Sequence, residues 1–107
     1  MKQRPEPLPT YDANIAIDAL AEALSALKGA AEIRAFLEDL CTPAELEAMG
    51  DRWRVVPCLL QGLPYREIHD RTLVSVTTVG RVARTLERGT GGYGIAARRL
   101  RLPTDSH

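Results

Sequence analysis

Hydroxyl and arginine side chains recur in the stretch 72–86, and no carboxylate interrupts them. The ones that can lie on an exposed side of a helix include Ser75, Thr77, Thr78, Arg81 and Arg84. Hydroxyl and guanidinium groups donate hydrogen bonds to phosphate oxygens, and a helix N-terminus that is free of carboxylates attracts anions. The chemistry that these residues offer is therefore the binding of a polyanion.

The residue types that catalysis needs are scarce. His69 and His107 are the only histidines, and no serine, cysteine or carboxylate stands at a useful spacing from a base. The chain has no glycine-rich phosphate loop, and Cys41 and Cys58 are not spaced as metal ligands. We therefore expect no enzyme, no metal site and no cofactor. Both cysteines are interpreted as small buried hydrophobes of a protein in the reducing cytoplasm.

Two short amphipathic helices are predicted around the polyanion-binding residues, at 64–72 and 75–86. Pro64 suits a first helical position, and Ser75 is a good N-cap. The apolar inner face of the second helix consists of Val79, Val82 and Leu86. This is the pattern of a helix-turn-helix motif, at about 64–87, whose second helix enters the major groove of DNA.

The turn between these two helices contains no glycine, although such turns often do. Either Leu73 and Val74 make the turn without a left-handed residue, or the two helices meet at a less usual angle. The alternative interpretation of the whole motif is a packed helical hairpin with a solvated basic face.

The net charge of zero hides a sharp difference between the two halves of the chain. Residues 1–51 carry a charge of −6 and residues 52–101 a charge of +7, and every base in the second half is an arginine. Such an asymmetry is typical of a protein with one polyanion-facing surface.

The length of 107 residues suffices for one domain, expected at 12–102, and no apolar run suggests a membrane span.

The remaining elements are predicted from helical periodicity and from helix start and stop signals. They are a flexible arm at 1–11, helices at 12–28, 30–40, 43–61 and 95–102, and a disordered tail at 103–107. Gly29 is expected to end the first of these helices. Thr42, Pro43 and Glu45 have the spacing of a capping box at the start of the third, which Pro57 should kink or restart.

Apolar side chains recur along the helix at 43–61 in alternating steps of three and four residues. They are Leu46, Met49, Trp53, Val56 and Leu60. Val55 and Leu59 add a second apolar strip, which is more apolar surface than a monomer of this size easily buries. This seam is therefore a candidate dimer interface, and the alternative is a central core helix.

The order and spacing of several segments resemble the Trp repressor superfamily, and most closely its YerC/YecD-like branch. The matching segments are Asp39–Pro43 with Glu45, Met49–Arg52, Leu59–Gly62, Tyr65–Ile68, Thr77–Val82 and Gly91–Tyr93, within a match over about residues 15–100. The resemblance implies an all-α, Trp-repressor-like helical bundle. It also implies an intertwined homodimer that binds double-stranded operator DNA through two helix-turn-helix units.

The resemblance implies roles for individual residues as well. The base-facing positions carry over to Val76, Thr77, Gly80, Arg66 and His69. The candidates for contacts with DNA phosphates are Ser75, Thr78, Arg81 and Arg84. Phosphate contacts position a protein on DNA, whereas contacts with base edges read the sequence.

Tryptophan is the effector of the Trp repressor itself, and its pocket carries over to Thr42, Arg52 and Arg81. The repressor has a glycine where this chain has Val82, and a branched side chain there should fill the space of the ligand. We therefore expect a homodimeric, sequence-specific repressor of palindromic operators that works without tryptophan. The alternatives are a tryptophan-responsive repressor and a dimeric interaction module whose helix-turn-helix no longer binds DNA.

Overall fold

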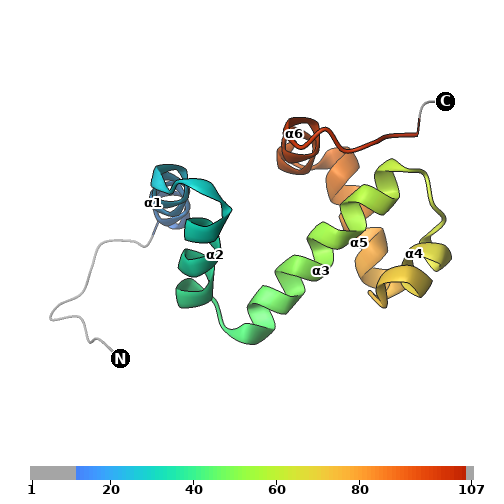
Figure 1. Cartoon of the computed structure of the whole chain (residues 1–107), viewed down its shortest axis with the longest axis horizontal. Coiled ribbons are helices and arrows are strands. Elements are labelled where there is room, and N and C mark those ends of the chain that lie inside the picture. The colour runs from blue at the N-terminus through green and yellow to red at the C-terminus, as the bar shows by residue number, and fades with distance from the viewer. Residues whose placement is uncertain (1–11, 106–107) are drawn as a thin grey trace, which may run out of the picture. The chain divides into compact units, whose positions relative to one another are not determined.

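The computed structural model describes residues 12–105, and the regular secondary structure of this part of the chain is entirely helical (Figure 1). The helices are α1 (Ala13–Ala26), α2 (Gly29–Leu40), α3 (Pro43–Leu60), α4 (Tyr65–Thr72), α5 (Val76–Arg88) and α6 (Gly92–Arg99). This confirms the predicted all-α class. The helices divide into two compact units, one ending at Leu40 and the other beginning at Cys41. The expected arm at 1–11 lies outside the described residues.

The first unit consists of α1 and α2, and neither helix has a buried residue. The Asp12 carboxylate caps α1 by accepting a 2.9 Å hydrogen bond from the Asn14 N–H. The prediction that Gly29 ends this helix is wrong, because α1 already ends at Ala26 and Leu27 adopts extended backbone. Gly29 instead opens α2 with a φ of +83°, a left-handed conformation that glycine adopts without a Cβ penalty.

The second unit begins with the capping box that the sequence predicts. The Thr42 hydroxyl accepts a 3.1 Å hydrogen bond from the Glu45 N–H, and the Glu45 carboxylate accepts a 2.8 Å bond from the Thr42 N–H. Pro43 then occupies the first turn of α3. Pro57 lies inside this helix, and α3 continues through it as one ribbon, so the predicted restart at Pro57 does not occur (Figure 1).

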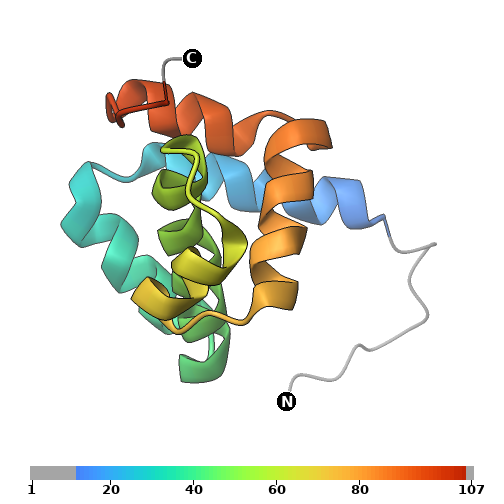
Figure 2. The ribbon, with the colours of Figure 1, turned by 90° about the vertical axis from the view of Figure 1, so that its right-hand side faces the viewer.

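The core of the second unit lies where α3, α4 and α5 meet (Figure 2). Its buried side chains are Val55, Val56, Ile68, Val74, Val79 and Val82. Val79 and Val82 confirm the predicted inner face of the second motif helix, and Leu86 packs against the same cluster. The prediction that Val56 belongs to a dimer seam is wrong, because this side chain is fully buried in the core of its own protomer.

The last helix starts earlier than the sequence suggests. The predicted range is 95–102, after a glycine-rich turn, but α6 spans Gly92–Arg99. Gly91 has a φ of +93° at the N-cap, and this left-handed residue lets the chain reverse within a short link. The ring of Tyr93 in the first turn of α6 lies 6.2 Å from the ring of Trp53 on α3, with the ring planes tilted by 41°.

Residues 103–105 return to the end of α3. The Asp105 N–H donates a 2.7 Å hydrogen bond to the Leu60 carbonyl, and the Gln61 side-chain amide donates a 3.3 Å bond to the Pro103 carbonyl. The expectation of a disordered tail at 103–107 therefore does not hold for 103–105, because both ends of this segment are tied to the end of α3.

Candidate nucleic-acid interface

The helix-turn-helix motif is formed by α4 and α5, which pack against each other and against α3 (Figure 2). Ser75 is the N-cap of α5, as predicted, and its hydroxyl accepts a 3.1 Å hydrogen bond from the Thr78 N–H. The same hydroxyl donates its hydrogen to the Thr78 hydroxyl over 3.0 Å. The Thr78 hydroxyl therefore keeps its own hydrogen for an outside acceptor, whereas the hydrogen of the Ser75 hydroxyl is already used by Thr78.

The turn before α5 is made by a left-handed leucine. Leu73 has φ +64° and ψ +9°, its side chain is 82% exposed, and its N–H donates a 2.7 Å hydrogen bond to the His69 carbonyl. The expectation that Leu73 and Val74 could turn without a left-handed residue is therefore wrong. Thr72 supports the turn, because its buried hydroxyl donates to the Ile68 carbonyl at 2.7 Å and accepts from the Val74 N–H at 3.1 Å.

His69 is predicted to face DNA bases, but one of its ring nitrogens is used inside the motif. Its Nδ1 atom lies 2.8 Å from the carbonyl oxygen of Val74, and its side chain is half-buried. A carbonyl oxygen can only accept, so Nδ1 carries the hydrogen and only Nε2 remains for another partner. His69 is thus a residue that positions the turn.

The other residues predicted to face bases are accessible, with one exception. Val76 and Thr77 are exposed in the first turn of α5, which contains no acidic residue, and Arg66 is exposed on α4. Gly80 lies on the same helix as Val76 and is half-buried. A Cβ atom at Gly80 would lie 3.7 Å from Cε2 of Tyr65, so an aromatic ring covers this glycine.

The arginines of the motif differ in whether a carboxylate neutralises them. Arg71 pairs with Glu67 at 2.6 Å, and Arg88 contacts Glu87 at 3.7 Å. Three others are exposed and have no carboxylate within 4.0 Å in the described part of the chain: Arg66, Arg81 and Arg84. These three are the ones predicted to contact DNA. An uncompensated guanidinium can bind a phosphate without first breaking an internal ion pair.

Of the three positions assigned to the tryptophan pocket, one lines a hollow beside the turn of the motif. A hollow of about 310 Å³ lies beside the turn of the motif, and Arg52 and Thr78 line it, whereas Thr42 and Arg81 do not. Val82 is 1% exposed and belongs to the core. Its side chain is therefore packed inside the core of the second unit.

The residues of the predicted dimer seam other than Val56 remain at least partly accessible. Met49 is 38% exposed, and Leu46, Trp53 and Leu60 are half-buried. The Sγ atom of Cys41 lies 3.8 Å from the sulfur of Met49. Both cysteines are free and half-buried, rather than fully buried as expected.

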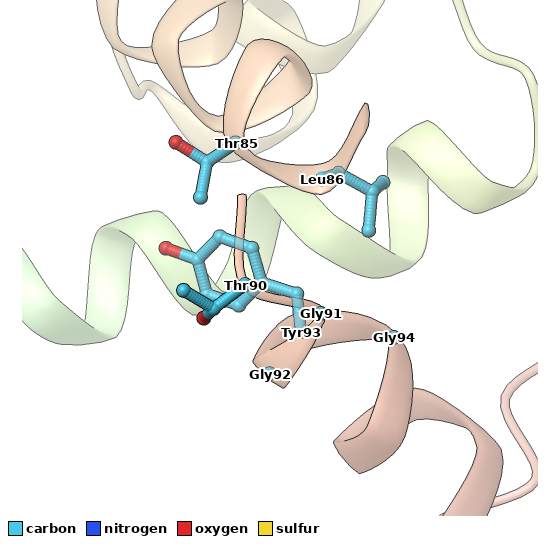
Figure 3. A pocket seen from close by; sticks show the side chains of 7 residues that line it. All are labelled: Thr85, Leu86, Thr90, Gly91, Gly92, Tyr93 and Gly94. Carbon is cyan, nitrogen blue, oxygen red and sulfur yellow. The ribbon is translucent and has the colours of Figure 1, made fainter. Parts of the chain in front are cut away.

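A second hollow, of about 350 Å³, lies between the end of α5 and the start of α6 (Figure 3). Its lining consists of Thr85, Leu86, Thr90, Gly91, Gly92, Tyr93 and Gly94. Tyr93 is the only titratable side chain among them, and sequence patterns indicate only a turn in this segment.

Within the described residues, no group of His, Cys, Asp and Glu could hold a metal ion. None of the described helices is both long and apolar enough to cross a bilayer.

Known proteins with a similar sequence or structure agree with this description. The model of the Trp repressor protein family matches residues 16–101. The uncharacterized protein YerC of Bacillus subtilis (strain 168) is 33% identical over 85 residues, which cover 79% of this chain and 82% of YerC.

Two solved structures are similar over most of the chain. A candidate Trp repressor from Staphylococcus aureus has a TM-score of 0.79 and 31% identity, covering 85% of this chain and 91% of its own. A TrpR-like protein from Eubacterium eligens ATCC 27750 has a TM-score of 0.76 and 33% identity, covering 82% and 91%. The extent of the family match and the identity to YerC lead to one conclusion: this chain belongs to the Trp repressor family.

Proposed function

We propose that the protein is a sequence-specific transcription regulator that binds palindromic double-stranded DNA as a homodimer and represses by occluding a promoter. The observation that supports this most is the state of the motif arginines. Arg66, Arg81 and Arg84 are exposed without a carboxylate partner among the described residues, while neighbouring arginines of α4 and α5 are paired. In this proposal α5 lies in the major groove and Val76 and Thr77 contact base edges.

Thr78, Arg81 and Arg84 are proposed to contact phosphates directly, and Ser75 to do so through the Thr78 hydroxyl, to which it donates its hydrogen. Arg66 on α4 is proposed to bind a guanine or an adjacent phosphate. His69 keeps a role in DNA binding through the turn that it holds, with Nε2 as its only free ring nitrogen.

The homodimer is supported by apolar surface that each protomer leaves exposed. The relevant side chains, with their exposed fractions, are Ile15 (66%), Ile17 (61%), Leu20 (36%), Leu40 (52%) and Met49 (38%). A second copy that covers this surface would stabilise the dimer by about 25 cal/mol for each Å² of apolar area. Two motifs related by a twofold axis would then read half-sites about one helical turn apart.

We propose that tryptophan is not required for DNA binding. Of Thr42, Arg52 and Arg81, only Arg52 lines the hollow beside the turn of the motif, and Val82, which stands where the resemblance places the repressor's glycine, is buried in the core. Isothermal titration of the protein with tryptophan tests this directly. The expected result is no binding heat and unchanged DNA affinity, and a tryptophan-dependent gain in DNA affinity would contradict it.

The DNA-binding proposal is tested by fluorescence anisotropy with random duplexes and duplexes selected from genomic fragments, at several salt concentrations. The logarithm of the affinity should fall linearly with the logarithm of the salt concentration, by about 0.9 for each phosphate contacted. The double variant Arg81→Ala, Arg84→Ala should lose measurable binding at these salt concentrations.

The matched control is the double variant Arg71→Ala, Arg88→Ala, which removes the same charge from arginines that already have carboxylate partners. It should bind DNA much more tightly than the first double variant. Weak binding by the wild type that does not depend on salt would refute the proposal and favour a dimeric interaction module.

A further inference from the structure

The ring of Tyr65 covers Gly80 on the outward side of α5. A Cβ atom at Gly80 would lie 3.7 Å from Cε2 of Tyr65 and 3.9 Å from Nη1 of Arg84. The ring of Tyr65 on α4 and the guanidinium of Arg84 on α5 therefore both lie within 4 Å of the Cβ position of Gly80. Tyr65, Arg84 and Glu87 also border a shared hollow of about 290 Å³.

The face of α5 that carries Gly80 is the face predicted to meet DNA. Thr77 precedes Gly80 by three residues and Arg84 follows it by four, and residues at these spacings lie on one side of a helix. Thr77 and Arg84 are both exposed. The ring of Tyr65 thus reaches the side of the motif on which a DNA duplex would lie.

Neither polar group of this pair has a partner among residues 12–105. In the described part of the chain, the Tyr65 hydroxyl makes no hydrogen bond and Arg84 makes no ion pair, and Tyr65 is 44% exposed. Glu87 is the nearest carboxylate along α5, and its contact is with Arg88 at 3.7 Å. An aromatic ring with an unused hydroxyl beside an unused guanidinium is suited to bind one anionic group.

Gly80 leaves open the space that Tyr65 and Arg84 border, and an alanine Cβ would still make only ordinary contacts there, at 3.7 Å and 3.9 Å. Its φ is not left-handed, so the backbone does not require a glycine, and a glycine inside a helix is less favourable than alanine by about 1 kcal/mol. A side chain larger than alanine would push the ring of Tyr65 off α5. The space above Gly80 is therefore filled by a side chain from α4 instead of by one from α5.

We propose that Tyr65 and Arg84, placed side by side over Gly80, form a clamp for one phosphodiester group of the DNA backbone. This inference rests on the proposed DNA-binding function and adds Tyr65, a residue to which sequence patterns assign no contact with DNA. The Tyr65 hydroxyl donates to one phosphate oxygen and Arg84 donates to the same phosphate. Because the clamp contacts the backbone, it contributes equally to binding of every DNA sequence.

The test compares Tyr65→Phe with Tyr93→Phe, a matched loss of one phenolic hydroxyl at the other end of α5, by anisotropy on random and selected duplexes. Tyr65→Phe should weaken binding by about tenfold on both duplexes, as expected for a hydrogen bond to a charged acceptor, with the salt slope unchanged. Tyr93→Phe should bind like the wild type. Thermal melting by circular dichroism should show that both variants remain folded.

Two further variants test the geometry of the clamp. Arg84→Ala should lower the salt slope by about 0.9 for each phosphate that it no longer neutralises. The losses of binding free energy caused by Arg84→Ala and Tyr65→Phe should not add in the double variant, because both residues bind the same phosphate. Gly80→Val should weaken binding at least as much as Tyr65→Phe, because its methyl groups displace the ring. A duplex with a single neutral methylphosphonate at the clamped phosphate should abolish the difference between wild type and Tyr65→Phe.

Each outcome supports or overturns the inference. Wild-type affinity of Tyr65→Phe would overturn it and leave the proposed function standing, and a weakening confined to one DNA sequence would overturn the assignment to phosphate. If the wild type itself does not bind DNA, the proposed function and this inference fail together.

Discussion

The Nδ1 atom of His69 lies 2.8 Å from the carbonyl oxygen of Val74, so a side chain of the first motif helix holds the backbone just before the second. The next residue, Ser75, caps α5. The hydrogen bond therefore fixes the direction in which α5 leaves the turn.

Replacing His69 by alanine should destabilise the protein by about 1–3 kcal/mol, because the Val74 carbonyl would lose its partner in a buried residue. Urea denaturation followed by circular dichroism measures this change. His69→Asn is the matched variant, since its amide can donate from nearly the position of Nδ1, and it should keep a substantial part of the stability. Equal midpoints for His69→Ala and the wild type would show that the bond contributes nothing.

Replacing Leu73 by glycine should stabilise the protein by up to about 1 kcal/mol. A left-handed conformation costs a non-glycine residue about 1–2 kcal/mol, and this gain is partly offset by the larger backbone entropy of an unfolded glycine. Little packing is removed, because the Leu73 side chain is 82% exposed. Leu73→Ala keeps the Cβ atom and should not show the gain, so equal melting temperatures for the two variants would contradict the explanation.

Two glycines, one inside α3 and one just after it, should respond oppositely to alanine. A Cβ at Gly62 would lie 2.5 Å from Oδ2 of Asp105, at a φ of +79°, whereas a Cβ at Gly50 would meet nothing within 4 Å. Gly62→Ala should therefore destabilise the protein by about 1–2 kcal/mol, and Gly50→Ala should stabilise it by up to about 1 kcal/mol. Differential scanning calorimetry of the two variants checks both signs, and a stabilised Gly62→Ala would contradict the strain assigned to this turn.

Replacing Met49 by serine should weaken the proposed dimer without unfolding the protomer. Met49 is 38% exposed on α3 and lies outside the core cluster, so its replacement leaves no core cavity. Sedimentation equilibrium should show a higher dissociation constant, and the melting temperature should depend more strongly on protein concentration. Glu47→Ser, an exposed polar position on the same helix, serves as the control. Identical dissociation constants for the two variants would place the dimer interface elsewhere.

Sequence patterns predicted the elements that depend on local chemistry. The capping box at Thr42 and Glu45 and the N-cap at Ser75 form as expected, because each needs only residues within one helical turn. The inner face of α5 was also predicted, since a periodic apolar stripe marks it. The left-handed Leu73 was not, because intrinsic preference disfavours that conformation and only the surrounding hydrogen bonds impose it.

Sequence patterns could not predict which residues from different helices contact each other. Tyr65 and Gly80 belong to different helices, and no spacing rule indicates that a ring from one covers a glycine of the other. The burial of Val56 has the same origin. Periodicity shows that this residue is apolar and on a seam, but which neighbour covers it is decided by how α3, α4 and α5 pack.

Trp53 is the only tryptophan of the sequence, and it lies on α3 with its ring 6.2 Å from that of Tyr93 on α6. Intrinsic fluorescence of this protein therefore comes mainly from an indole that is packed beside α6 and against the core where α3, α4 and α5 meet. Its emission maximum is a native optical reporter for the α3–α6 contact, without any added dye. A spectral shift on addition of DNA would reveal that binding at the motif changes the packing of α3 against its core or against α6, and a constant spectrum would show that this packing behaves as a rigid support.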